Sequence, residues 1–127
     1  MSFLKSLFGE GNNDESSKMN WIALASLQQL DEIIEQSTSK AIVIFKHSTR
    51  CGVSRMVLNQ FEKEYLSEDK VDLYFLDLLN HRDISNEIAN RFEVVHQSPQ
   101  LLLIKNGVVV YDASHNDINA MELENFI

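Results

Sequence analysis

Cysteine is almost absent from this sequence, which has a single one, Cys51, among its 127 residues. One cysteine excludes an internal disulfide framework and leaves too few thiols for a cysteine-based zinc site. Proteins without disulfides are typical of compartments that keep thiols reduced. We therefore expect this protein in the cytoplasm.

Basic residues and long apolar runs are scarce as well. Eleven lysines and arginines stand against 19 aspartates and glutamates, so the net charge is −8 and the isoelectric point is near 4.8. Phosphate binding needs a basic surface, and we therefore expect no nucleic-acid partner. No apolar run approaches the ~20 residues of a membrane-spanning helix, so we also expect no membrane span.

The whole sequence has 44% apolar and 24% charged residues, which together with its length is typical of one globular domain. Residues 1–8 are amphipathic but short, and we expect a terminal turn that docks on the body. Residues 9–18 are rich in Gly, Asn, Asp, Glu and Ser, a composition typical of a mobile linker. The sequence thus predicts an N-terminal turn and linker over 1–20 and a domain over 21–127.

Apolar spacing in the domain predicts alternating helices and strands. From Trp21 to Ser37 the apolar residues recur at the helical period, and Ser26 is the expected cap of a helix over Leu27–Gln36. The further expected elements are a strand over 41–45, a helix over 53–65, a strand over 71–79, a helix over 83–92, strands over 100–105 and 108–113, and a closing helix over 117–127 capped by Asp117 or Asn116. The pair Asn106-Gly107 between the last two strands predicts a tight hairpin.

This order, an N-terminal helix followed by βαβ–α–ββα, resembles the thioredoxin arrangement. The sequence therefore predicts an α/β, thioredoxin-like fold around a four-stranded mixed sheet. Its single cysteine falls where the first strand of the βαβ unit meets its helix.

The surroundings of Cys51 favour a reactive thiol. A helix N-terminus carries partial positive charge and free N–H groups, and both stabilise a thiolate. Between residues 41 and 60 there are three cations, Lys46, Arg50 and Arg55, and no acidic residue. A lone cysteine is often only a small buried apolar side chain, but polar and cationic neighbours argue against deep burial here. We infer that Cys51 is a nucleophile.

Ser54 follows Cys51 by three residues and shares the first turn of the expected helix. We expect its hydroxyl to lie near the sulfur and to donate a hydrogen bond to the thiolate. A serine cannot close a disulfide with Cys51. Any disulfide of Cys51 must therefore join another molecule, and a second thiol must release it.

Three further features have two interpretations each. Pro99, the only proline, stands just before a strand. Most X–Pro bonds are trans. Thioredoxin-like domains, however, keep a cis-proline beside the active cysteine, and the residue before it, here Ser98, offers its backbone to a thiol substrate. Arg50 and Arg55 form either a solvated face or a pair that holds the carboxylates of a small acidic thiol. The histidines show no metal-ligand spacing, so we expect no metal; we interpret His47 and His115 as hydrogen-bonding neighbours of the thiol region.

Several segments together resemble the YtxJ-type bacilliredoxins, monothiol thioredoxin-fold proteins of the bacillithiol system. The matching blocks are Phe45-Lys46-His47-Ser48-Thr49-Arg50-Cys51 with Ser54, Ser98-Pro99-Gln100, Lys105-Asn106-Gly107 and Asp112-Ala113-Ser114-His115. The similarity runs from about Trp21 to the C-terminus. One position departs from the pattern, because Gly52 follows the cysteine where we expect proline, and glycine frees the backbone that proline would fix.

This resemblance implies a monothiol thiol–disulfide oxidoreductase. Cys51 would attack a protein–bacillithiol mixed disulfide, take the bacillithiol and release the protein thiol. The implied partners are S-thiolated client proteins, a low-molecular-weight thiol such as bacillithiol as cosubstrate, and a reductase, with no other cofactor; we expect a monomer. The implied site comprises catalytic Cys51 and Ser54, substrate-binding Thr49, Arg50, Gly52, Ser98 and Pro99, and supporting Lys46, His47, Arg55 and His115.

A second resemblance leaves an alternative open. Cys51-Gly52-Val53-Ser54 is similar to the Cys-Gly-Phe-Ser glutaredoxins, which bind iron–sulfur clusters with glutathione. Those proteins usually carry Thr-Val-Pro before the strand and a Gly-Gly-x-Asp loop after the hairpin, and this chain has neither. The alternative function is therefore a thioredoxin-fold binding module or an iron–sulfur carrier.

Overall fold

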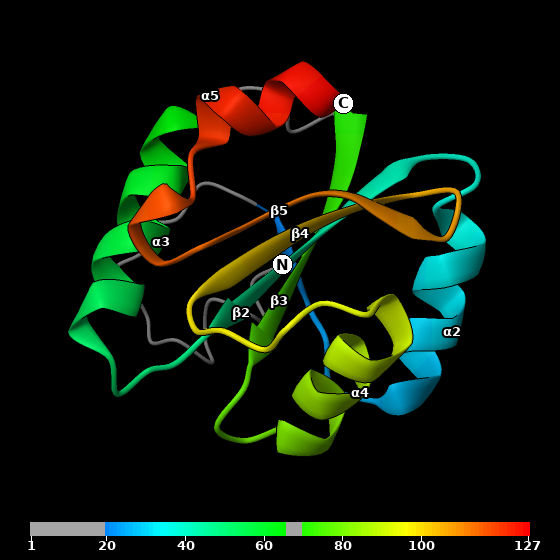
Figure 1. The fold of residues 1–127 in the computed structure, drawn as a ribbon, viewed down its shortest axis with the longest axis horizontal. Helices are drawn as coiled ribbons and strands as arrows, with labels where there is room; N and C mark the ends of the chain where they lie inside the picture. Colours follow the sequence, from blue (N-terminus) through cyan, green and yellow to red (C-terminus); the bar gives the residue numbers. More distant parts are fainter. Residues whose placement is uncertain (1–19, 66–69) are drawn as a thin grey trace.

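The computed structural model describes residues 20–65 and 70–127 (Figure 1). Within them the chain forms a five-stranded sheet of order β1-β3-β2-β4-β5. The strands are β1 Trp21–Ala23, β2 Ala41–His47, β3 Val71–Asp77, β4 Gln100–Lys105 and β5 Val108–Ser114. β3 runs parallel to both β1 and β2, whereas β4 is antiparallel to β2 and to β5. The sheet is therefore mixed, as expected.

Helices cover both faces of this sheet. They are α2 Leu27–Gln36, α3 Gly52–Glu64, α4 Arg82–Phe92 and α5 Ala120–Leu123, with 3-10 turns η3 His115–Asp117 and η4 Glu124–Phe126. In Figure 1, α3 and α5 lie on one side of the sheet, and α2 and α4 lie on the other. None of the described helices is long and apolar enough to cross a membrane.

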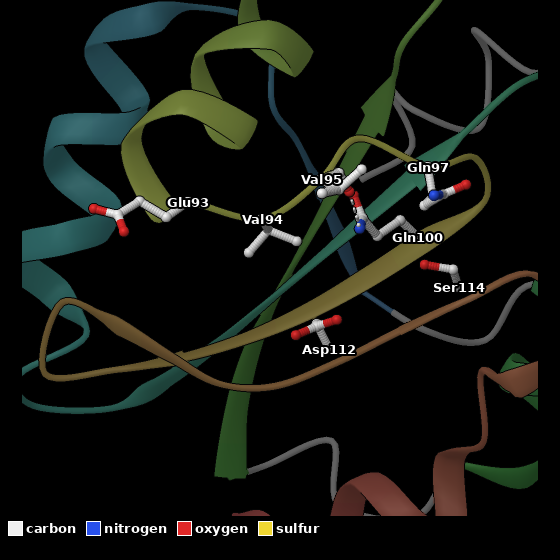
Figure 2. A pocket seen from close by; sticks show the side chains of 7 residues that line it. All are labelled: Glu93, Val94, Val95, Gln97, Gln100, Asp112 and Ser114. Carbon is white, nitrogen blue, oxygen red and sulfur yellow. Dashed lines mark hydrogen bonds between the residues drawn. The ribbon is translucent and has the colours of Figure 1, made fainter.

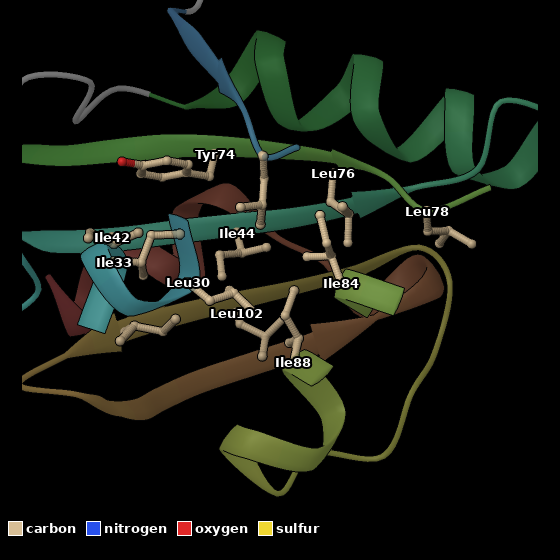
Figure 3. Close-up of a cluster of buried hydrophobic side chains, with 12 residues drawn as sticks. Leu30, Ile33, Ile42, Ile44, Tyr74, Leu76, Leu78, Ile84, Ile88 and Leu102 are labelled. Carbon is tan, nitrogen blue, oxygen red and sulfur yellow. The ribbon is translucent and has the colours of Figure 1, made fainter. Parts of the chain in front are cut away.

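Two apolar clusters fix these layers, because successive side chains of a strand point to opposite faces. On the α3 side, Val43 and Phe45 of β2 pack with Val57 and Phe61 of α3. On the other side, Ile42 and Ile44 belong to the cluster that Figure 3 shows between the sheet and helices α2 and α4. Both faces of β2 are thus buried, which explains why its sequence is continuously apolar rather than alternating.

Several local expectations are confirmed. Ser26 caps α2, which spans Leu27–Gln36, and forms a capping box in which the Ser26 hydroxyl accepts from the Gln29 N–H. Asn106 and Gly107 both have positive φ, 54° and 79°, as a two-residue type I′ hairpin turn requires. The βαβ–α–ββα order holds throughout.

Two expectations are wrong. Residues Trp21–Ala23 form strand β1 beside β3, so the helical spacing does not extend back to Trp21 and the sheet has five strands instead of four. The single closing helix over 117–127 is replaced by η3, α5 and η4, and the cap of α5 is Asn119 rather than Asp117 or Asn116. The expected N-terminal turn and linker fall almost wholly on residues 1–19, outside the described residues, so the division at residue 20 stays a prediction.

Candidate active site

Cys51 stands where strand β2 passes into helix α3. Its backbone is the N-cap of α3, and its thiol is free and partly exposed. The turn before the helix is closed by a hydrogen bond of 3.2 Å from the Cys51 N–H to the Ser48 carbonyl. The first-turn N–H groups of a helix lack intrahelical partners, so this position exposes the sulfur to the positive end of α3.

Ser54 is placed differently from our expectation. Its hydroxyl is fully buried, accepts from the Ser48 N–H at 3.1 Å and bonds the His47 Nδ1 at 2.8 Å. In the described part of the chain, no hydrogen bond joins this hydroxyl to Cys51. Ser54 therefore holds the loop that carries the cysteine through its buried bonds to Ser48 and His47, instead of donating a hydrogen bond to the sulfur.

His47 lies on the α3 face of β2, with its ring 5.3 Å from that of Phe75. Burial lowers the pKa of His47; the charge of Asp77 opposes this shift and that of Arg55 adds to it. The imidazole is therefore neutral at neutral pH. It joins the thiol region through Ser54, so the structure places His47 where the sequence suggested, beside the cysteine loop.

Asp77 is a neighbour of this site that sequence reasoning missed. It pairs in register with His47, because parallel strands β2 and β3 end at the same edge of the sheet. Its Oδ2 accepts from the Asn80 Nδ2 at 2.8 Å, while its buried Oδ1 has no hydrogen-bond partner among the described residues. The sequence signal was available, since Asp77 ends the strand next to the one that delivers the cysteine.

Lys46 does not lie with the thiol. As the residue before His47 on β2, it points to the opposite face of the sheet, and its side chain is fully buried. Its ammonium contacts the Ser85 carbonyl at 3.2 Å and the His96 Nδ1 at 3.3 Å. Burial lowers the pKa of Lys46 from 10.5 to about 8. Of the three cations that lie near Cys51 in the sequence, only Arg50 and Arg55 therefore remain near it in the structure.

Those two cations, Arg50 and Arg55, differ in their surroundings. The Arg55 Nη1 donates to the Thr49 carbonyl at 3.2 Å, so this side chain braces the cysteine loop. Arg50 is exposed and has neither an ion pair nor a hydrogen bond among the described residues. Thr49 and Gly52 are exposed beside it, which leaves a charged, open rim around Cys51.

The proline loop reaches the same end of the sheet. The Ser98–Pro99 bond is cis, as the thioredoxin arrangement predicted. Antiparallel pairing of Lys46 with Gln100 places Pro99 level with the end of β2 that leads to Cys51. The Pro99 carbonyl accepts from the His115 N–H at 2.9 Å, so His115 joins this region through its backbone, while its side chain is exposed.

Comparison with known proteins identifies the family. The family model of the monothiol bacilliredoxin BrxC matches residues 22–123. This chain belongs to the monothiol bacilliredoxin family. A solved structure described provisionally as an oxidoreductase with a thioredoxin fold is similar at 36% identity and a TM-score of 0.72, covering 82% of this chain and 90% of that one.

Thioredoxins share the fold of this bacilliredoxin. The thioredoxin of Malassezia sympodialis has 21% identity and a TM-score of 0.66, over 87% of this chain and 90% of that chain. The Schistosoma mansoni thioredoxin pre-protein has 25% identity and a TM-score of 0.62, over 85% and 95%. The thioredoxin-like fold is therefore confirmed. Membership of the monothiol bacilliredoxin family makes the protein a thiol–disulfide oxidoreductase, and Cys51 is its only cysteine.

A shallow hollow of about 380 Å³ adjoins the proline loop of this bacilliredoxin. Figure 2 shows it between the segment that follows α4 and strand β5, lined by Glu93, Val94, Val95, Gln97, Gln100, Asp112 and Ser114. None of the expected site residues lines it, although Gln97 and Ser114 are chain neighbours of Ser98 and His115. Within residues 20–65 and 70–127, no three His, Cys, Asp or Glu side chains gather as a metal site requires.

Proposed function

We propose that this bacilliredoxin removes bacillithiol from S-thiolated proteins. The Cys51 thiolate attacks the bacillithiol sulfur of the mixed disulfide, a new S–S bond forms to Cys51, and the protein sulfur leaves as a thiolate that takes up a proton. One disulfide replaces another, so no external oxidant or reductant is consumed in this step. The observation that carries the proposal is the position of the only cysteine, partly exposed at the N-cap of α3.

The residues around Cys51 support binding of an acidic small thiol. Arg50 is exposed and unpaired among the described residues, so its guanidinium is available for the carboxylates of such a molecule. Thr49 and Gly52 are exposed on either side of the Arg50–Cys51 pair. In this proposal Ser98 and Pro99 receive the extended backbone of the client beside the mixed disulfide.

The cycle needs a second thiol. Ser54 occupies the position from which another cysteine would attack, so the Cys51–bacillithiol disulfide must be opened by a further small thiol or by a reductase. A protein that acts in this way works where small thiols are kept reduced, which supports a cytoplasmic location. We propose that it acts as a monomer, since each chain carries the complete set of site residues.

Mass spectrometry tests the proposal directly. The purified protein is mixed with a peptide that carries bacillithiol on its cysteine, and the reaction is quenched by acid. We expect the mass of one bacillithiol on the protein, located on Cys51, together with free peptide thiol. The Cys51→Ser variant must show neither product, and an unmodified wild-type protein beside an intact peptide disulfide would contradict the proposal.

The same experiment identifies the small thiol. A matched peptide that carries glutathione instead is treated in parallel, at equal concentration and pH. We expect faster release of bacillithiol than of glutathione. Equal rates for the two peptides would leave a general dethiolating activity and overturn the assignment to bacillithiol.

A further inference from the structure

Lys46 is a fully buried lysine on the side of the sheet that faces away from Cys51. Its ammonium has no carboxylate partner among the described residues. It lies instead 3.2 Å from the Ser85 carbonyl of α4 and 3.3 Å from the His96 Nδ1. Replacing a buried charge by an apolar side chain of similar size is often neutral or stabilising. A stability role alone therefore does not account for a lysine here.

The chemistry of this contact fixes the state of His96. An ammonium can only donate, so the His96 Nδ1 must accept and the ring proton must sit on Nε2. The Ser85 hydroxyl, 3.2 Å from the same Nδ1, donates to it as well. Partial burial of the ring lowers the pKa of His96, and the charges of Lys46 and Arg82 lower it further, so this neutral form is the one present at neutral pH.

His96 belongs to the segment 93–99, which joins α4 to β4 and ends in the cis Ser98–Pro99 bond. Two other hydrogen bonds hold this segment to the sheet region: the Gln100 Nε2 donates to the Val95 carbonyl at 3.0 Å, and the His115 N–H donates to the Pro99 carbonyl at 2.9 Å. Among the described residues, the only hydrogen bonds from side chains of residues 96–98 are those of His96. Without its contacts to Lys46 and Ser85, no side chain of residues 96–98 is hydrogen-bonded to the rest of the described chain.

We propose that Lys46 is a positioning residue for thiol exchange. From the face of the sheet that α2 and α4 cover, it holds the segment 93–99 in place through His96. The proposal rests on the proposed function, since the segment matters because it receives the client next to Cys51. Lys46 does not touch the reacting sulfur. It sets where the Ser98–Pro99 backbone stands when a mixed disulfide binds.

The first test does not depend on activity. The His96 ring is titrated by NMR in the wild type, in Lys46→Met and in the control variant Lys40→Met. Lys40 lies at the other end of the sheet, where its ammonium pairs with the Asp72 carboxylate at 3.2 Å. We expect the His96 pKa to rise in Lys46→Met, because a nearby positive charge has been removed, and to stay unchanged in Lys40→Met. An unchanged His96 titration in Lys46→Met would overturn the contact on which the proposal stands.

The second test separates positioning from thiol activation. For release of bacillithiol from a peptide, we expect kcat/KM to fall about tenfold in Lys46→Met and in His96→Leu, mainly through KM. The rate of Cys51 alkylation by iodoacetamide should stay at the wild-type value in both variants, as it should in Lys40→Met. Because the His96 side chain is exposed and Lys46 keeps its bond to the Ser85 carbonyl in His96→Leu, this second variant carries the test if Lys46→Met does not fold.

These outcomes are distinguishable. Unchanged kcat/KM in both variants, or alkylation slowed as much as exchange, would overturn the positioning role. A wild-type protein that releases no bacillithiol would instead contradict the proposed function. In that case a raised His96 pKa in Lys46→Met still supports the contact between the lysine and the segment.

Discussion

At the scale of single residues, Ser54 shows how a side chain near a nucleophile can act through the backbone. A hydroxyl three residues after a cysteine on a helix is within reach of the sulfur by spacing alone. Here its oxygen is already used by the Ser48 N–H and by His47, below the loop and out of solvent. Because buried polar groups are costly when unpaired, these bonds fix Ser54 inward and hold the turn that begins α3.

Replacing Ser54 by alanine should therefore destabilise the protein. The buried Ser48 N–H and the His47 Nδ1 lose their common partner, and the free energy of unfolding should fall by about 1–3 kcal/mol. Urea unfolding followed by fluorescence of the single tryptophan, Trp21, measures this, since Trp21 packs against Phe45. Thr49→Ala, an exposed site in the same loop, is the control and should change stability by less than about 0.5 kcal/mol. An Ser54→Ala variant as stable as the control would contradict this account.

At the scale of elements, most of the fold could be predicted from the sequence because its signals are local. The buried strands are short apolar runs, the Asn106-Gly107 turn needs two positive φ angles, and Ser26 with Gln29 forms a capping box. The cis form of Pro99 followed from the arrangement of the elements and not from the proline itself. Each of these features is set by residues within a few positions of one another or by a common topology.

The errors at Trp21–Ala23 and at Ser54 have a common physical cause: a tertiary contact overrides a local pattern. Trp21–Ala23 begins a stretch of apolar residues at helical spacing, but these three residues form a strand because they pair with the edge of β3. Lys46 looked like a partner of Cys51 because a strand buried on both faces shows no polar alternation. Strict alternation with His47 would still have placed Lys46 on the other face. The inward position of Ser54 depends on His47, and no spacing rule contains that contact.

The end of the chain gives a prediction about α5. This helix has only four residues, and the N–H groups of its second and third residues, Met121 and Glu122, donate to the Asn119 Oδ1 at 2.8 and 3.0 Å. Asn119→Ala should lower the free energy of unfolding by about 1 kcal/mol, as loss of an N-cap does. Asn116→Ala, at one of the two caps expected from the sequence, should have no measurable effect in the same urea titration. The reverse order of the two effects would show that the helix begins earlier than described.

At the scale of the whole molecule, the net charge opposes the proposed substrate, whereas the cysteine loop carries a positive charge. The net charge of −8 repels a carboxylate-bearing thiol, whereas Arg50 stands next to Cys51 with no acidic partner among the described residues. The Debye length is ~10 Å at 0.1 M ionic strength, so a charge at the site acts on a bound thiol while distant charges are largely screened. Local attraction should therefore outweigh the overall repulsion under these conditions.

Two variants with the same net charge test this balance. Arg50→Met removes the charge beside Cys51. Lys63→Met removes a charge near the other end of α3, about 17 Å from Gly52 along the helix axis. We expect Arg50→Met to slow the reaction of Cys51 with the disulfide of a carboxylate-bearing thiol about fivefold, because one ion pair at 4 Å in water is worth ~1 kcal/mol. Lys63→Met should react at the wild-type rate. With the carboxylates of the thiol esterified, all three proteins should react alike, and equal slowing by both variants would assign the effect to the overall charge instead of to Arg50.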